Sequence, residues 1–565
     1  IWAEIDLNAG LLLPAVSDQA SPMPKRPALI VRAAKNFTEG HRYIAVLRKL
    51  KNEAGDVIPA QHPFQVCRDG DDTYSQLPQI AERCAALEQN VFSVLRQPNV
   101  GVAIDESLYL AWDFTIASAE NDVARLRHMR DDAFQNVLNE PANAPNPGEP
   151  DYPAGNAPEF TITEVTENPD GADGKTVRRI RGVLTTPSYV IPADPAPLDD
   201  QSELQAQLQQ LAAQCNSITQ GNCGVPGVGG AGDGLELAAS ASLPPNRLFY
   251  SPVDNSSPVP DATNTEDPTG LRYGDGMPDR NPTGDLATNF TCNIPRSAVN
   301  NAPSMDAAQL TDVRPVRPTL YGHGLLGGHG EGNGQASDFG NRYGLMTCAM
   351  DWFGFAAGDI PNVATALVDL SNFPVVPDGS QQGMLNQMFL ARLAVHPDGL
   401  AANPAFQVQG RPVFDRREVF YHGNSQGGIL GGVLVAASKD INRGVLGVLG
   451  MNYSTLLPRS TDFATYSIPL YLAYPNDLDR PLNFALIQML WDRSENNGYA
   501  AHITDNGALG GPDNQVLMHP AFGDHQVSMW TADVMARTVG ARVDAQRVLP
   551  SRSPEVDGAE YALID

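Results

Sequence analysis

The amino-acid sequence predicts an α/β protein in which helices cover both faces of a mostly parallel β-sheet, preceded by a smaller β-rich module. Three observations support this prediction. Short apolar runs alternate with helical stretches after Arg317, several of the runs end at a glycine or an aspartate, and a hairpin signature precedes them. Strands that alternate with helices are typical of parallel sheets, because each crossover returns the chain to the same edge.

The N-terminal part is predicted to be a β-rich domain over residues 1–140, because strand-like runs at 28–33 and 43–47 are separated by turn signals. Helical stretches are also expected there, near 79–95 and 122–137. Residues 141–158 contain many prolines and glycines and no apolar periodicity, so we expect a linker there. The second domain is then expected over 159–565.

A hairpin opens the second domain. Two strand candidates, 160–165 and 177–184, are joined by the turn-rich sequence NPDGADGK. Further on, residues 199–215 are predicted to be helical, and the glycine-rich run that follows lacks the spacing of a phosphate-binding loop. Later strand candidates are the run that ends at Leu320, then 345–349, 419–421, 445–451 and 516–518, with a helix expected over 530–542.

Charge and hydropathy exclude two classes of partner. Among 565 residues, 65 acidic and 38 basic side chains give a net charge of −27, which disfavours nucleic acid and anionic bilayers. The longest apolar run, 427–437, has about eleven residues, and crossing a bilayer takes roughly 18. We therefore expect no transmembrane segment. The chain starts at Ile1 without an initiator methionine, so we expect a processed product or a piece of one.

Six cysteines form two close pairs and one distant pair along the chain, which predicts up to three disulfides, although fifteen pairings are possible. They are Cys67, Cys84, Cys215, Cys223, Cys292 and Cys348. Without any C-x-x-C motif, an oxidising, extracytoplasmic or secreted setting is favoured over a zinc site. Buried thiols are the alternative.

The sequence Gly423-Asn424-Ser425-Gln426-Gly427 is a G-x-S-x-G motif between a strand candidate and a helix of small residues. Such a turn presents the serine hydroxyl at the top of a sheet, and the small flanking residues let helix and strand pack closely. Ser425 is therefore the candidate nucleophile, with a structural glycine turn as the alternative.

A second glycine-rich loop, GHGLLGG, follows the strand candidate that ends at Leu320. Its backbone N–H groups can turn toward the oxygen of an ester carbonyl, and we assign the oxyanion hole to the N–H groups of Leu325 and Gln426. His323 and Gly324 are interpreted as supports of the loop, and a catalytic role for His323 is given little weight.

On these motifs the segment from Arg317 to Asp565 resembles the α/β-hydrolase superfamily, in particular secreted bacterial lipases and esterases. Residues 1–140 resemble the N-terminal domain that accompanies such proteins, through AKNFTEGHRYIAVLRKL and LYLAWDFTIAS. The resemblance implies an insertion at about 195–285, and the long segment 452–511 is a possible cap over the site. If it is a cap, Met489, Leu490 and Trp491 are candidate acyl-pocket residues.

The family's chain order is serine, acid, histidine. The resemblance places the acid at Asp524, in the loop after the seventh strand, and an eighth strand at 560–564. No histidine follows in the last 40 residues, so one interpretation places the base beyond Asp565, in an additional C-terminal fragment. In the other, His525 is the base and an earlier carboxylate orients it. The carboxylates considered are Asp477, Asp492 and Asp505, and His502 and His519 are poorer bases.

The resulting prediction is a secreted serine hydrolase that cleaves a small-molecule, lipid or polymer ester through an acyl-enzyme on Ser425. No metal or cofactor is implied. Two alternatives remain: a non-catalytic surface or assembly protein built on the same fold, and a peptidase or amidase, since the same triad cleaves amides.

Overall fold

The computed structural model describes residues 2–6, 28–71, 77–191, 247–249, 277–282, 284–476, 478–505 and 509–542. Contacts divide the chain into a smaller unit, Phe37–Asn121, and a larger unit made of Ile1–Asn36 and Asp122–Asp565. The predicted helix at 199–215, the pair Cys215 and Cys223, most of the predicted insertion and the predicted strand at 560–564 lie outside the described residues.

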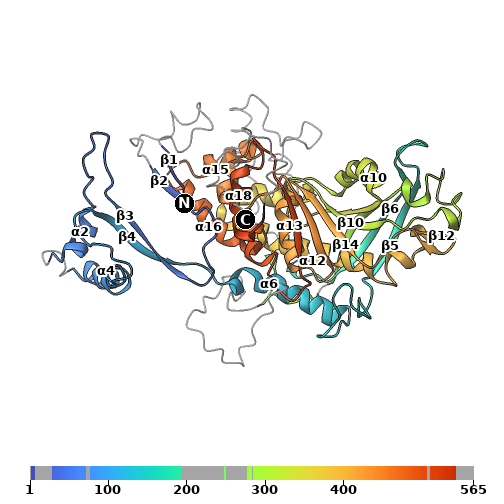
Figure 1. Cartoon of the computed structure of the whole chain (residues 1–565), viewed down its shortest axis with the longest axis horizontal. Helices are drawn as coiled ribbons and strands as arrows, with labels where there is room; N and C mark the ends of the chain where they lie inside the picture. The colour runs from blue at the N-terminus through green and yellow to red at the C-terminus, as the bar shows by residue number, and fades with distance from the viewer. Residues whose placement is uncertain are drawn as a thin grey trace, which may run out of the picture. The chain divides into compact units, whose positions relative to one another are not determined.

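A central eight-stranded sheet organises the larger unit, in the order β16-β15-β14-β10-β11-β9-β6-β5 (Figure 1). The strands from β16 to β11 are parallel, and β9, β6 and β5 continue the sheet in antiparallel fashion. The bounds are β5 (Phe160–Glu167), β6 (Thr176–Thr186), β9 (Leu286–Pro295), β10 (Arg317–Gly322), β11 (Leu345–Met350), β14 (Val419–Asn424), β15 (Ile441–Gly447) and β16 (Gln515–His519). This confirms the predicted α/β class and the predicted hairpin, which is β5–β6.

Helices pack on both faces of the sheet. α13 (Gln426–Ala437) packs against Tyr421, since a Cβ at Gly431 would meet that ring at 2.2 Å. α9 (Gly332–Gln335) lies against Tyr321, since a Cβ at Gly332 would meet Tyr321 at 3.5 Å. Tyr321 pairs with His422, the neighbour of Tyr421, so the two tyrosines point to opposite faces. Other helices of the larger unit are α11 (Ile360–Val368), the almost wholly buried α12 (Val375–Val395) and α18 (Met529–Val539).

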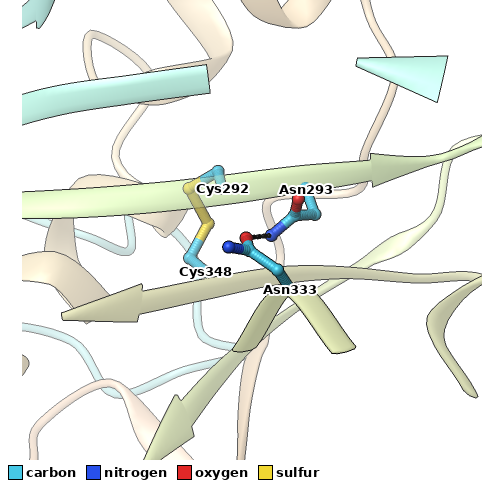
Figure 2. Close-up of a disulfide and its surroundings, with 4 residues drawn as sticks. All are labelled: Cys292, Asn293, Asn333 and Cys348. Atoms are coloured by element: carbon cyan, nitrogen blue, oxygen red, sulfur yellow. Dashed lines mark hydrogen bonds between the residues drawn. A yellow bond between two sulfur atoms is a disulfide. The ribbon is translucent and has the colours of Figure 1, made fainter. Parts of the chain in front are cut away.

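A disulfide fixes the junction between the parallel and antiparallel parts of the sheet. Cys292 on β9 and Cys348 on β11 are directly opposed in the strand register, with their Cα atoms 4.0 Å apart, and both are fully buried. Figure 2 shows this bond beside Asn293, whose side-chain N–H donates to Asn333 Oδ1 at 3.0 Å. A second disulfide joins Cys67 and Cys84, so the prediction of disulfides is confirmed for both described pairs.

The smaller unit combines two strands with helices. β3 (Arg42–Arg48) pairs in antiparallel register with β4 (Leu108–Thr115), and the helices are α2 (His62–Asp69), α4 (Pro78–Leu87) and the short α5 (Ser93–Leu95). Its own core contains Phe64, Val91, Phe92, Leu95 and Leu108. Within this unit, the region predicted as β-rich therefore has a two-stranded sheet, and α4 and α5 confirm the helical stretch expected near 79–95.

The boundaries of the units differ from the predicted domain over 1–140. Helix α6 (Ala119–Asp132) supplies Arg130, whose guanidinium donates to the carbonyl oxygens of Ala437 and Leu509, both at 2.7 Å. Phe134 packs edge-on against Phe389 at 5.5 Å. Residues 122–140 belong to the larger unit because their apolar and charged side chains are buried in its core.

The segment predicted as a cap, 452–511, consists mainly of short helices that border the sheet's carboxyl edge (Figure 1). They are α14 (Tyr453–Leu456), α15 (Phe463–Ala473), α16 (Arg480–Trp491) and α17 (Asn496–Tyr499). Shorter elements elsewhere are β1 (Trp2–Asp6), β2 (Ala28–Arg32), β7 (Val190–Ile191), β8 (Arg247–Leu248), α10 (Asn341–Tyr343), β12 (Gln407–Val408) and β13 (Arg411–Pro412). None of the described helices has both the length and the apolar character needed to cross a bilayer.

Candidate active site

Ser425 occupies the turn between β14 and α13, at the carboxyl edge of the parallel strands. Its φ of 57° and ψ of −121° lie in a region that is unfavourable for residues other than glycine. The Ser425 N–H donates to Gly447 O at 3.0 Å, and Ser425 O accepts from the N–H groups of Gly428 at 2.8 Å and Ile429 at 2.9 Å. These bonds hold the half-buried serine on a strained turn, as the G-x-S-x-G pattern predicts.

Glycines around Ser425 permit the close approach of α13 and β10. A Cβ at Gly427 would lie 2.2 Å from Gly322 O, and one at Gly423 would lie 2.5 Å from Gly427 O. Both distances are far below a van der Waals contact. The helix that starts at Gln426 therefore requires these small residues to lie against the loop that follows β10.

The loop after β10 is tied to the serine turn by the Gln426 side chain. Gln426 Oε1 accepts from the Leu326 N–H at 3.2 Å, and Gln426 Nε2 donates to Phe355 O at 2.8 Å. The backbone N–H groups of Leu325 and Gln426 make no hydrogen bond to any residue in the described part of the chain. Two such donors beside a nucleophile are what an oxyanion hole requires. Sequence reasoning assigned only the backbone of Gln426 and missed the bracing role of its amide.

His323 is fully buried, and both of its ring nitrogens are engaged. Its Nε2 accepts from the Trp352 N–H at 2.9 Å, so Nδ1 carries the proton and donates to Gly324 O at 2.8 Å. Burial lowers the pKa of His323 and keeps the ring neutral. This geometry suits a support of the loop and leaves no ring nitrogen for proton transfer. Gly324 is held in turn by its N–H, which donates to the Glu331 carboxylate at 2.8 Å.

A histidine–aspartate pair that sequence reasoning missed lies at the same edge. Asp351 directly follows β11, and its Oδ1 accepts from the His329 N–H at 2.6 Å and from His329 Nδ1 at 2.8 Å. Burial acts to raise the pKa of Asp351, but these bonds outweigh it and the pKa lies below its ordinary value. The only sequence signals for the pair are an aspartate at a strand end and a histidine just after the glycine-rich loop.

Asp524 lies in the loop after β16. Because β16 pairs with β15 through His519 and Gly447, that loop starts at the edge of the sheet that also holds Ser425. The Asp524 carboxylate accepts from the N–H groups of Gln526 at 2.7 Å and Val527 at 2.9 Å, and the side chain is half-buried. The assignment of Asp524 as the acid stays a prediction that is compatible with this position.

His525 is exposed, and its imidazole makes no hydrogen bond or ion pair to a described residue. Its carbonyl oxygen accepts from Thr461 N at 2.8 Å and Thr461 Oγ1 at 3.1 Å, which fixes the backbone and not the ring. Of the carboxylates considered as its partner, Asp492 is bound by Gln488 and Asn497, and Asp505 by His502. Asp477 lies outside the described residues. Among the described residues, no carboxylate is hydrogen-bonded to the His525 imidazole.

An apolar cavity of about 50 Å³ lies beside the oxyanion loop. Leu325 and Leu326 form one wall and α11 a second. Helices α15 and α16, in the segment predicted as a cap, form a third, with α16 contributing Phe484, Ile487 and Trp491. Of the three predicted pocket residues, Trp491 lines the cavity, while Met489 points outward and is exposed, so its predicted role is wrong. Leu490 is partly buried and does not line it. Helical spacing places Met489 on the opposite side of α16 from Trp491 and Ile487.

A larger cleft, of about 540 Å³, lies away from the serine turn. It is lined by Tyr152, Phe414 and Arg416, among others, near the start of β14, whereas Ser425 follows its end. Six strand residues span about 20 Å, so this cleft is not part of the candidate active site. Among the described residues, no group of three or more histidine, cysteine, aspartate or glutamate side chains is placed to hold a metal ion.

No protein-family model matches the chain, and no curated protein matches it. Solved structures that are similar in part include acetyl xylan esterase 1 from a Thermoanaerobacterium species, at 15% identity and a TM-score of 0.30, over 45% of this chain and 69% of that one. An acylaminoacyl peptidase from Pyrococcus horikoshii matches at 12% identity and a TM-score of 0.27, over 45% of this chain and 33% of the peptidase. An acetyl xylan esterase from a Paenibacillus species matches at 14% identity and a TM-score of 0.29, over 46% and 72%.

At these scores, the assignment of the fold depends on the chain's own strand order and serine turn. A parallel sheet whose order reverses at β10 and β11, with antiparallel strands at one edge and a serine on the turn between β14 and α13, defines an α/β-hydrolase fold. The strand order and the serine turn thus confirm the predicted resemblance at the level of the fold.

Proposed function

We propose that the protein is a serine hydrolase that cleaves carboxylic esters through an acyl-enzyme on Ser425. The main support is the pairing of a strained serine turn with two unused backbone N–H groups, those of Leu325 and Gln426. Ser425 Oγ attacks the ester carbonyl carbon while a histidine takes its proton. The alkoxide then leaves with that proton, and water hydrolyses the acyl-enzyme.

The roles of the other residues follow from this proposal. The Leu325 and Gln426 N–H groups stabilise the oxyanion, and the Gln426 amide holds the loop in place. Asp524 is proposed as the acid that orients the histidine. Ester cleavage is proposed ahead of peptide cleavage because the cavity beside the oxyanion loop has only apolar lining residues apart from Tyr466. Such walls suit the acyl chain of an ester and offer little to a peptide backbone.

Labelling with a fluorophosphonate probe tests the nucleophile. We expect the native protein to be labelled at Ser425, and Ser425→Ala to lose labelling and about 10⁴-fold or more of its esterase rate. Ser371→Ala is the control, because that serine lies in the short helical turn after α11, where its N–H donates to Asp369. Absence of labelling in folded native protein would favour the non-catalytic alternative. Faster cleavage of matched amides than of esters would favour the peptidase alternative.

The same assay locates the base. If His525 takes the proton, His525→Ala should lose labelling about as completely as Ser425→Ala does. If His525→Ala labels normally, the base is another histidine. Peptide mapping of the native material then shows whether residues beyond Asp565 supply it.

We also propose an extracytoplasmic location, on the basis of the two disulfides. Thiol labelling of the protein in freshly isolated cell fractions tests this. Recovery of the protein mainly in a reducing cytoplasmic fraction, with all cysteines reactive, would contradict it.

A further inference from the structure

The cap helix α16 presents apolar side chains to solvent as well as to the core. Leu482, Leu486 and Met489 are 59%, 55% and 60% exposed in the part of the chain that the structure describes. Their spacing of four and three residues places them on one face of the helix. Large apolar side chains that gather on one exposed face indicate an interaction surface, whereas single exposed ones are ordinary.

The opposite face of the same helix belongs to the candidate active site. Phe484, Ile487 and Trp491 are buried there and line the apolar cavity that Leu325 and Leu326 of the oxyanion loop also border. A single helix therefore separates this exposed apolar face from the cavity beside the oxyanion loop.

The face is also free of charge. Residues 481–491 contain no charged side chain, although 18% of the chain's residues are charged. Arg480, at the start of the helix, is turned back: its guanidinium donates to Tyr474 O at 3.0 Å and lies 4.0 Å from the centre of the Tyr471 ring. Interfacial helices that bind anionic lipid carry lysine or arginine on their polar face, and α16 carries none there.

We propose that the outer face of α16, formed by Leu482, Leu486 and Met489, binds the surface of an uncharged lipid phase and brings its esters to the adjacent cavity. This proposal adds a substrate class to the proposed function. The expected effect on ester-hydrolysis rates rests on the proposed function, whereas the expected binding to vesicles does not. A chain with a net charge of −27 is repelled by an anionic surface, which favours an uncharged one. The same repulsion disfavours a second copy as the occupant, and one face of a three-turn helix is small for a stable protein interface.

Vesicle binding tests the surface independently of catalysis. In a Ser425→Ala background, phosphatidylcholine vesicles should co-sediment the protein, and Leu482→Ser/Leu486→Ser/Met489→Ser should weaken that partition about tenfold or more. The matched control is Val165→Ser/Leu517→Ser, which removes side chains that are 45% and 63% exposed on strands β5 and β16. The control should bind as the parent does, and circular dichroism checks that all variants are folded.

Three results would overturn the inference: no binding of the parent to phosphatidylcholine, equal losses in the triple variant and the control, or a parent that sediments as a dimer which the triple variant dissociates. The last result would assign the face to a second copy. In the active background, the triple variant should lose more rate on an emulsified long-chain ester than on a soluble short-chain ester. Failure of Ser425 labelling would remove the proposed activity and leave the binding result standing.

Discussion

At the scale of single residues, the serine turn depends on glycines, because there is no room for a Cβ atom at these positions. Gly427 lies so close to Gly322 that a Cβ would meet a carbonyl oxygen at 2.2 Å, and backbone cannot move aside as a flexible side chain can. The position of Ser425 therefore depends on the absence of side chains at Gly322 and Gly427, and on the hydrogen bond from its N–H to Gly447 O.

Gly427→Ala is expected to destabilise the protein by about 1–3 kcal/mol or more and to abolish labelling of Ser425, because the added methyl group forces α13 away from β10. Thermal unfolding and probe labelling measure the two effects. Gly330→Ala is the control, since a Cβ there has no atom within 4 Å. Equal behaviour of the two variants would contradict this account of the turn.

Asp359 is a buried carboxyl group near the oxyanion loop, and its Oδ2 accepts from the Ala356 N–H at 3.0 Å. Burial raises the pKa of Asp359 to about 6, against roughly 3.9 in an unfolded chain. The folded state therefore binds this proton more tightly. The resulting stabilisation is fully present below about pH 4 and is lost as the pH rises through about 6.

Asp359→Asn should remove the contribution of this carboxyl group to the pH dependence of the free energy of unfolding. Between about pH 4 and 6, the free energy of unfolding of the native protein should fall relative to the variant by up to about 1.4 kcal/mol per pH unit. Urea unfolding at several pH values measures the difference. Two parallel curves over this range would show that the carboxyl group titrates normally.

At the scale of elements, the junction between β9 and β11 joins the antiparallel edge to the parallel sheet. The disulfide between Cys292 and Cys348 closes a loop of 56 residues across this junction, between directly opposed positions. A loop of that length is expected to stabilise the folded state by about 4 kcal/mol through the entropy of the unfolded chain.

Cys292→Ala/Cys348→Ala is expected to lower the free energy of unfolding of the larger unit by about 2–5 kcal/mol, as measured by urea unfolding with a signal from that unit. Cys67→Ala/Cys84→Ala is the comparison, because that disulfide lies within the smaller unit, Phe37–Asn121. The prediction fails if the second variant destabilises the larger unit as much as the first does.

At the scale of the whole molecule, one buried arginine connects three distant parts of the larger unit. Arg392 on α12 donates to Glu140 at 2.7 Å and to Asp440 at 3.1 Å, and it is 1% exposed. Tyr152 adds a hydrogen bond to Asp440 at 2.8 Å. The segment predicted as a linker, 141–158, is therefore attached to the core through Tyr152 rather than standing apart from it.

Arg392→Ala is expected to cost about 3–5 kcal/mol, because two buried carboxylates lose their partner. The control is Arg417→Ala, whose side chain is 85% exposed and paired with Asp415, with an expected cost of about 0–1 kcal/mol. Urea unfolding of both variants measures the contrast. A similar loss of unfolding free energy in the two variants would show that, without Arg392, Glu140 and Asp440 bind other groups or become protonated.

The sequence by itself determined the strands, the serine turn and the glycine-rich loop, because each depends on residues close together in the chain. The run of small residues from Gly423 to Gly427 is compatible with few backbone shapes, and alternation of strands with helices predicts a parallel sheet. The strand at β15 was expected at 445–451 and lies at Ile441–Gly447, since the glycines there weaken the apolar pattern.

Only the tertiary structure decided which distant residues meet. Examples are the contact of Asp351 with His329, the hydrogen bonds of the Gln426 amide to two loops, and the burial of Arg392. No helical or strand periodicity in the sequence connects the residues that meet in these contacts. The same holds for α16: its sequence is apolar almost throughout, and packing alone selects which face borders the cavity and which face meets solvent. Local patterns depend on the chain's own geometry, whereas such contacts depend on how separate elements pack against one another.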